Sequence, residues 1–180
     1  AIKAFTANAA FITGDDAVLT GGMGAKICAG VSGTWNADAI KAKLGNNYAA
    51  VKLPTFTVGG VQMQMGSFGG YKLIGVNKGT KSPLDAMALA EWLTNEQSQA
   101  TRFAKRALGP SNLVIAASEE VKANVALGAL AAQNAFATSQ KDVLGLYWSP
   151  AEAFGTEMEA KNYTKTIQQQ LDDMVKQITA

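Results

Sequence analysis

The sequence contains no histidine and only one cysteine, Cys28. Histidine is the commonest general base near neutral pH and the commonest metal ligand in proteins. Its absence therefore excludes a Ser-His-Asp triad and a zinc site built on histidine. A single cysteine excludes a disulfide within the chain. We expect no cofactor and no metal site, but hydrolysis of a glycoside stays open because it needs only two carboxylates.

Charge is scarce as well. Charged residues make up 17% of the 180 residues, compared with about 25% in typical globular proteins. The 16 lysines and arginines are scattered, and the net charge is +2. Charge therefore indicates neither nucleic acid nor an anionic membrane as a partner. No glycine-rich segment ends in Gly-Lys-Ser or Gly-Lys-Thr, which excludes the phosphate-binding loop of a transporter ATPase.

Short apolar segments in the first half of the chain predict strands. Three such segments predict strands, at residues 25–31, 48–53 and 71–76, the first of them buried. Cys28 lies in the first of them and is expected to be buried and inert. Gly59 and Gly60 separate strand-like segments at 55–58 and 61–65. This two-residue glycine spacing predicts a β-hairpin.

Apolar residues at helical spacing predict helices over most of the remaining chain. The expected ranges are 1–13, 15–19, 35–44, 83–93, 94–108, 118–136, 144–160 and 164–178. Asp15 is expected to cap the second helix. Trp92 lies mid-helix among alanines and leucines, which predicts a core position. Mixed elements followed by a series of helices favour an α/β fold with a helix-rich second half.

Several local strings resemble extracellular solute-binding proteins of the maltose and maltodextrin-binding type, which are receptors of carbohydrate ABC importers. The strings, in order, are AKICAGVSGTW (25–35), KLPTF (52–56), GGYKLIGVN (69–77), AEWLTNEQSQ (90–99), LGPSN (108–112) and YWSPAEAFG (147–155). Their order and spacing are those of the carboxy-terminal half of such a receptor. The resemblance implies the two-lobed α/β fold called periplasmic-binding-protein-like type II, in which the chain crosses a hinge between lobes.

The same resemblance implies how the chain is divided. Residues 1–68 would belong to the second lobe, residues 69–138 would cross into the first lobe, and residues 139–180 would return to the second as closing helices. It also implies an extracellular location, as a cell-surface lipoprotein or a periplasmic protein. The expected function is to bind maltose or maltodextrin-like sugars and deliver them to a membrane ABC permease, without catalysis.

The expected ligand site consists of aromatic and polar residues. A sugar presents a flat face of C–H groups, which an aromatic ring can cover, and a rim of hydroxyls for polar groups. Trp35 follows a glycine at a predicted strand-to-helix junction, and Tyr147 and Trp148 precede Pro150 at a helix start. The resemblance places Trp35 and Trp148 on the sugar-facing side of the second lobe. Tryptophan is more often a core residue, so a packing role is the alternative for both.

Three further residues complete the expected site. Glu152 lies one helical turn after Trp148 and would share its face, where its carboxylate could accept hydroxyl hydrogen bonds. A solvated helix charge is the alternative. Gly69 and Gly70 predict a hinge or a close backbone approach to the ligand, or else a turn between strands.

Two other functions stay open from the residues alone. One is a glycan-active hydrolase that uses carboxylates, for which no particular pair stands out. The other is an interaction fragment that binds no sugar by itself. Half of a two-lobed protein would expose apolar faces, and large apolar patches rarely stay exposed on monomers. Dimerisation or association with the missing amino-terminal half is therefore expected.

Overall fold

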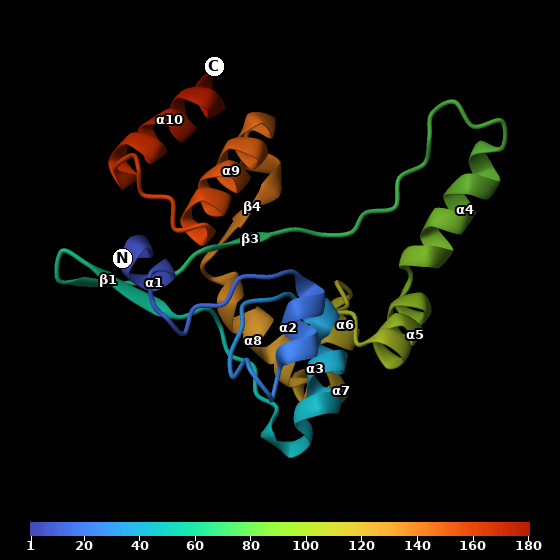
Figure 1. Ribbon diagram of the computed structural model, residues 1–180. Coiled ribbons are helices and arrows are strands. Elements are labelled where there is room, and N and C mark those ends of the chain that lie inside the picture. The colour runs from blue at the N-terminus through green and yellow to red at the C-terminus, as the bar shows by residue number, and fades with distance from the viewer. The chain divides into compact units, whose positions relative to one another are not determined.

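The structure is a computed structural model that describes all residues, 1–180, with ten α-helices and four short β-strands (Figure 1). The chain divides into two units, each assembled from separate parts of the sequence. Unit 1 comprises Ala1–Leu19, Pro54–Gly69 and Phe136–Ala180, and unit 2 comprises Thr20–Leu53 and Gly70–Ala135. The helix α2 (Asp16–Gly22) contains the first boundary between them.

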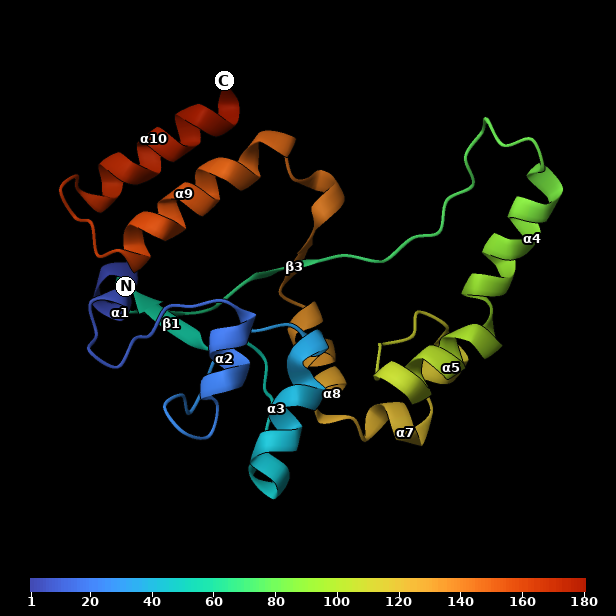
Figure 2. The same cartoon turned by 45° about the vertical axis from the view of Figure 1, so that its right-hand side comes forward.

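Unit 1 combines two small sheets with the closing helices. Its elements are α1 (Ile2–Thr6), β1 (Thr55–Val58), β2 (Val61–Gln64), β3 (Ser67–Gly69), β4 (Ala137–Ser139), the 3-10 turns η3 (Gln140–Asp142) and η4 (Gly145–Tyr147), α9 (Trp148–Glu159) and α10 (Ile167–Thr179). β1 and β2 form an antiparallel pair, and β3 pairs with β4 in parallel. The two long helices α9 and α10 lie side by side in both views (Figures 1 and 2).

The predicted hairpin is confirmed, and its turn explains the two glycines. Thr55 pairs with Gln64 and Val58 with Val61, so two residues connect the strands. Gly59 and Gly60 have φ values of 57° and 81°. A two-residue turn whose twist matches the strands needs positive φ at both positions, which glycine adopts without strain.

The core of unit 1 lies where α9 meets the other helices. Met158, on α9, is 1% exposed and is the largest fully buried side chain. α9 packs against both α1 and α10. The buried hydroxyl of Thr6 on α1 lies 2.7 Å from that of Tyr163, so the polar groups beside the core are paired. α10 begins with a capping box, in which Thr166 and Gln169 hydrogen-bond reciprocally.

Unit 2 contains helices and 3-10 turns but no strand of either sheet. Its elements are η1 (Thr34–Asn36), α3 (Ala37–Leu44), η2 (Gly45–Asn47), α4 (Pro83–Thr94), α5 (Glu96–Arg106), α6 (Leu113–Ala116), α7 (Glu119–Lys122) and α8 (Val125–Asn134). Ile115, Val121 and Leu127 form its buried cluster, and Phe103 packs against them. These residues come from α5 to α8, so four successive helices meet at one core.

Side-chain caps define where those helices begin. Asn95, Asn112, Ser118 and Asn124 precede α5, α6, α7 and α8, and each side chain accepts hydrogen bonds from backbone N–H groups of the next turn. Such a cap satisfies donors that the helix itself leaves unpaired. The expected helix over 118–136 is therefore two helices, because Asn124 starts a new one.

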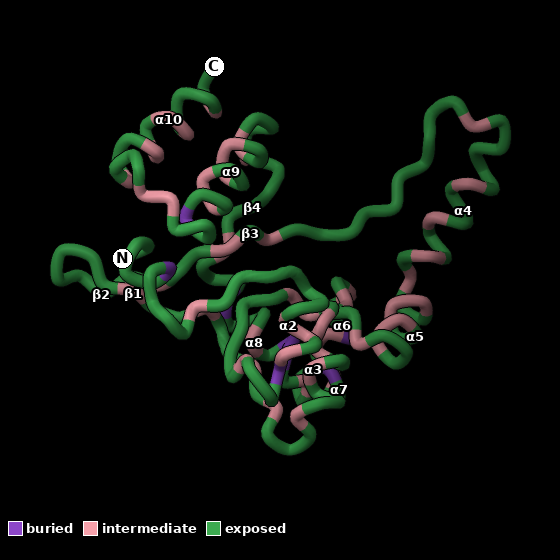
Figure 3. Tube along the Cα trace, in the orientation of Figure 1, coloured by how far each residue is buried: buried purple, intermediate pink, exposed green.

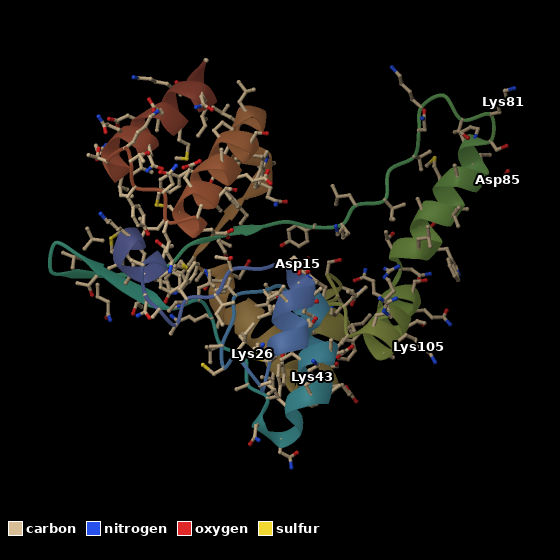
Figure 4. All side chains as sticks on the ribbon, in the orientation of Figure 1. Asp15, Lys26, Lys43, Lys81, Asp85 and Lys105 are labelled. Carbon is tan, nitrogen blue, oxygen red and sulfur yellow. The ribbon has the colours of Figure 1, made fainter.

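The helix α2 is capped at both ends as well. Asp15 Oδ1 accepts from the backbone N–H groups of Ala17 and Val18, which confirms the predicted cap. At the other end, Lys43 Nζ donates to the carbonyl of Gly21 at 2.8 Å. Asp15 and Lys43 are labelled in Figure 4. An acidic cap and a basic side chain at opposite ends also suit the helix dipole.

The three strands predicted from apolar segments are wrong. Residues 25–31, 48–53 and 71–76 form no strand, and an isolated bridge between Met23 and Ile27 is the nearest approach to one. Leu73 is 86% exposed, Cys28 is exposed, and Figure 3 shows the trace between β3 and α4 as almost entirely exposed. A strand needs a partner backbone for its ladder, which apolar composition alone does not supply.

Two helix-based expectations also need correction. The helix expected over 1–13 is confined to Ile2–Thr6. Trp92, expected in the core, is exposed on α4. α4 packs against α5, and its apolar residues are spread around the helix, so one neighbour cannot cover them all.

Gln133 gives a test of the unit 2 packing. Its buried side chain on α8 accepts a hydrogen bond from the backbone N–H of Leu53 at 3.1 Å. We expect Gln133→Met to lower the free energy of unfolding by about 1–3 kcal/mol, because the substitution leaves a donor without this acceptor. Urea denaturation followed by circular dichroism measures the change.

The matched control is Gln97→Met on the exposed face of α5. It should change stability by less than about 0.5 kcal/mol, as surface substitutions usually do. Equal effects of the two variants would contradict a structural role for the Gln133 hydrogen bond.

Candidate functional site

Three aromatic rings meet in unit 1, and we call Phe68, Tyr147 and Trp148 the aromatic triad. The ring centroids of Phe68 and Trp148 are 5.0 Å apart, those of Phe68 and Tyr147 5.5 Å, and those of Tyr147 and Trp148 5.3 Å. The interplanar angles are 59°, 75° and 83° in the same order. Tilted and edge-to-face arrangements at these distances are favourable for aromatic rings.

The parallel pairing of β3 with β4 brings the triad together. Phe68 lies in β3 opposite Thr138 of β4. The chain then runs from β4 through η3 and η4 to α9, whose first residue is Trp148 (Figure 1). Pro150 falls in the first turn of α9, where the missing N–H of proline breaks no helical hydrogen bond. Residues far apart in the sequence thus form one aromatic surface.

The triad is neither fully buried nor fully solvated. Trp148 is 43% exposed and Phe68 41%, while Tyr147 is half-buried. Two half-exposed rings present apolar surface to solvent, and their other faces are held by each other and by Tyr147. Such a surface can cover the apolar face of a flat ligand.

Glu152 lies on α9 one turn beyond Trp148 and is exposed. Positions four apart in a helix lie on the same face. The structure therefore places a carboxylate on the same side of α9 as the triad's tryptophan. A carboxylate there can accept hydrogen bonds from hydroxyl groups.

Trp35 belongs to unit 2 and is not part of the triad. It lies in η1 with 69% of its surface exposed. Its ring lies over Gly33, where an added Cβ would come within 1.9 Å of a ring carbon. Gly33 is therefore required for this ring position, since any larger residue would displace the indole.

Gly69 and Gly70 stand at the end of β3. The boundary between the two units falls between them, with Gly69 in unit 1 and Gly70 in unit 2. Both have ordinary negative-φ or extended backbone, so neither is required for a left-handed turn. At Gly69 a Cβ would lie 3.3 Å from the Cβ of Ala137, which shows that the two strands approach closely there.

A shallow groove of about 330 Å³ lies between α9 and α10. It is lined by Pro150, Ala153, Phe154, Glu157, Asn162, Thr164, Lys165, Gln170, Asp173, Met174 and Gln177. Lys165 donates to Asp173 at 2.8 Å; this hydrogen bond raises the pKa of the lysine and lowers the pKa of the carboxyl. The pair stabilises the folded chain between those two pKa values, and its contribution is lost as pH falls through the lowered pKa or rises through the raised one. An exposed pair of this kind contributes little.

The sequence alone identified Tyr147 and Trp148 but not Phe68. A single phenylalanine before a pair of glycines is a weak signal, and the contact depends on the pairing of β3 with β4. No group of three or more histidine, cysteine, aspartate or glutamate side chains is placed to hold a metal ion. No helix combines the length and the apolar character that crossing a membrane requires.

Comparison with known proteins gives a family. The family model described as bacterial extracellular solute-binding protein matches residues 2–129. A galactooligosaccharide-binding protein from Bacillus subtilis (strain 168) is 29% identical over 130 residues, which cover 71% of this chain and 30% of that protein.

Solved structures show the same fold. A structure with acarbose is 29% identical and superposes with a TM-score of 0.83. The match covers 99% of this chain and 48% of the chain in that structure. The maltodextrin binding protein MalE1 from L. casei BL23, solved without ligand, is 23% identical with a TM-score of 0.66. The match covers 81% of this chain and 41% of that protein. The chain thus spans less than half the length of these relatives.

These matches confirm the helix-rich α/β fold class, as a portion of a solute-binding-protein fold, and they confirm the resemblance seen in the sequence. The matching family consists of binding proteins rather than enzymes. The family match extends over more than half of the sequence. The chain belongs to the bacterial extracellular solute-binding protein family.

Proposed function

We propose that this chain is the carbohydrate-binding portion of a receptor that delivers oligosaccharides of the maltodextrin type to a membrane ABC importer. The observation that carries the proposal is the half-exposed aromatic triad in a member of a solute-binding family. The rings of Trp148 and Tyr147 supply the apolar surface that the C–H face of a pyranose needs. The relatives at 29% identity, one named for galactooligosaccharide binding and one solved with acarbose, also favour an oligosaccharide ligand.

Each predicted site residue has a role in this proposal. Trp148 stacks on a sugar ring, Tyr147 extends the apolar surface and Glu152 accepts hydrogen bonds from sugar hydroxyls. Trp35 supplies a further aromatic wall for the ligand. No covalent step is involved, so no catalytic residue, cofactor or metal is assigned.

We propose that Gly69 and Gly70 form a hinge of the chain. Hinges consist of a few element-terminal residues that absorb changes in φ and ψ, and these glycines end β3 at the boundary of the units. The division into a second lobe at 1–68 and 139–180 and a first-lobe segment at 69–138 stays a prediction.

The proposed partners follow from the family. The sugar-loaded receptor would dock on an ABC permease outside the cytoplasmic membrane, either as a lipid-anchored surface protein or in the periplasm. The exposed apolar segment 71–76 and the partial coverage of the relatives favour association with further protein. The partner would be a second copy or the amino-terminal half of a longer protein.

Calorimetric titration tests the proposed function. We expect maltotriose and acarbose to bind the chain with one site, and sorbitol to give no heat because this open-chain polyol has hydroxyls but no pyranose face. No release of reducing sugar should accompany binding. Absence of binding by both sugars, in this chain and in one extended to the length of its relatives, would contradict the proposal.

A further inference from the structure

We propose that Phe68 is a positioning residue for the sugar-binding surface: its ring holds the indole of Trp148 in the orientation in which Trp148 meets the ligand. This inference rests on the proposed function and concerns the same site. It assigns a role to a residue that carries only a weak signal in the sequence and that is not itself required to touch the sugar.

The first step of the argument is where each neighbour of Trp148 comes from. Trp148 contacts two other rings, those of Tyr147 and Phe68. Tyr147 precedes Trp148 directly in the chain, so it moves with the start of α9. Phe68 comes from β3, a separate part of the sequence. Within the triad, Phe68 is therefore the ring that ties Trp148 to another element of unit 1.

The second step is that Phe68 is held in place by its backbone. The β3–β4 ladder pairs Ser67, Phe68 and Gly69 with Ala137, Thr138 and Ser139. Just before the ladder, the N–H of Ser67 donates to the carbonyl of Phe136 at 3.2 Å. Gly69 has no side chain to separate the two strands at Ala137. A ring anchored this way offers Trp148 a fixed surface.

The third step is that Trp148 needs such a surface. It is the first residue of α9, only the single 3-10 turn η4 precedes it, and 43% of its surface is exposed, so no surrounding core fixes its ring. An aromatic contact biases a ring orientation by about 2- to 10-fold over one without the contact. If the ligand binds only one orientation of the Trp148 indole, its apparent affinity falls in proportion to the fraction of molecules that hold that orientation. Removal of the Phe68 ring should therefore weaken binding without removing a sugar contact.

The test compares four variants of the chain: Phe68→Leu, Phe68→Tyr, Trp148→Phe and the control Phe5→Leu. Phe5 forms an edge-to-face pair with Phe11 at 5.0 Å, elsewhere in unit 1, so its replacement removes a similar ring contact away from Trp148. Near-ultraviolet circular dichroism reports whether the indole is held in a fixed, asymmetric environment. The difference between the parent and Trp148→Phe isolates the Trp148 signal from those of Trp35 and Trp92.

We expect Phe68→Leu to lose most of the Trp148 signal and to weaken maltotriose binding by about 3- to 10-fold. Phe68→Tyr keeps the ring and should keep both the signal and the affinity. Phe5→Leu should change neither. An unchanged Trp148 signal in Phe68→Leu would overturn the inference, and so would a lost signal with unchanged affinity.

The design separates this inference from the proposed function. If neither the parent nor the chain extended to the length of its relatives binds sugar, the proposed function fails and the ligand role of Phe68 fails with it. The spectra would still decide whether Phe68 orients Trp148. A different outcome would overturn only the positioning role. In that outcome the parent binds sugar, Trp148→Ala abolishes binding, and Phe68→Leu binds with the same affinity as the parent.

Discussion

Replacement of Trp148 by alanine is expected to weaken maltotriose binding by about 30-fold or more, which corresponds to about 2 kcal/mol. Buried aromatic anchors are the side chains whose truncation most often has an effect of this size. Trp148 is 43% exposed in the free chain, so it has surface left to bury against a ligand. Calorimetric titration of parent and variant measures the ratio of Kd values.

The matched control for this prediction is Trp92→Ala. Trp92 is an exposed tryptophan on α4 of unit 2 and lies outside the triad. Its replacement should leave the Kd for maltotriose within about twofold, since surface contacts away from the ligand contribute little. Equal losses in both variants would mean that the triad is not the ligand surface. Trp148→Phe keeps an aromatic face and should retain part of the affinity.

Replacement of Met158 by alanine should have the largest effect on stability, lowering the free energy of unfolding of unit 1 by about 2–5 kcal/mol. Met158 is 1% exposed on α9, and α9 packs on both α1 and α10. Truncation removes buried apolar surface and leaves a cavity that the neighbouring helices fill only in part. Urea denaturation is followed by near-ultraviolet dichroism with and without Trp148→Phe, and the difference between the two reports on unit 1 because the triad lies there.

The control is Met87→Ala on α4, which truncates an exposed methionine in the same way. It should change stability by less than about 0.5 kcal/mol. Following two signals matters because a chain of two units need not unfold in one step. A loss of far-ultraviolet signal that precedes the Trp148 transition would indicate that unit 2 unfolds first. Unchanged stability of Met158→Ala would contradict its position in the core.

Local interactions account for what could be predicted from the sequence. The Gly59-Gly60 hairpin closes over two residues, and the Asp15 cap reaches only to Ala17 and Val18. Geometry over such short separations depends on residue types that are visible in the sequence. The two closing helices were predicted for the same reason, since their apolar residues recur at helical spacing.

Strand pairing accounts for most of what could not be predicted. Residues 71–76 have the composition of a buried strand but no partner ladder, so they form none. Conversely, Ser67–Gly69 forms a strand because Ala137–Ser139, far along the chain, lies beside it. Apolar composition indicates that a segment tends to be buried, whereas the identity of the neighbouring strand depends on the whole fold.

The same distinction between local and non-local contacts applies to the candidate site. Tyr147 and Trp148 are adjacent in the sequence and could be identified from it. Phe68 joins them only through the β3–β4 pair. Trp35 lies in the other unit, and its role in binding stays a prediction. When strand pairing brings the residues of a site together, only those that are neighbours in the chain can be identified as a group from the sequence.

The side-chain caps of α5 to α8 have a consequence for how this region can evolve. Each helix carries its own start signal in the residue before it, as Asn124 does for α8. A connecting loop can therefore gain or lose residues while the capping residue stays with its helix. Homologues should vary in the lengths of these loops and keep Asn, Ser, Asp or Thr at the position before each helix. In this part of the fold, selection can act on one helix and its cap at a time.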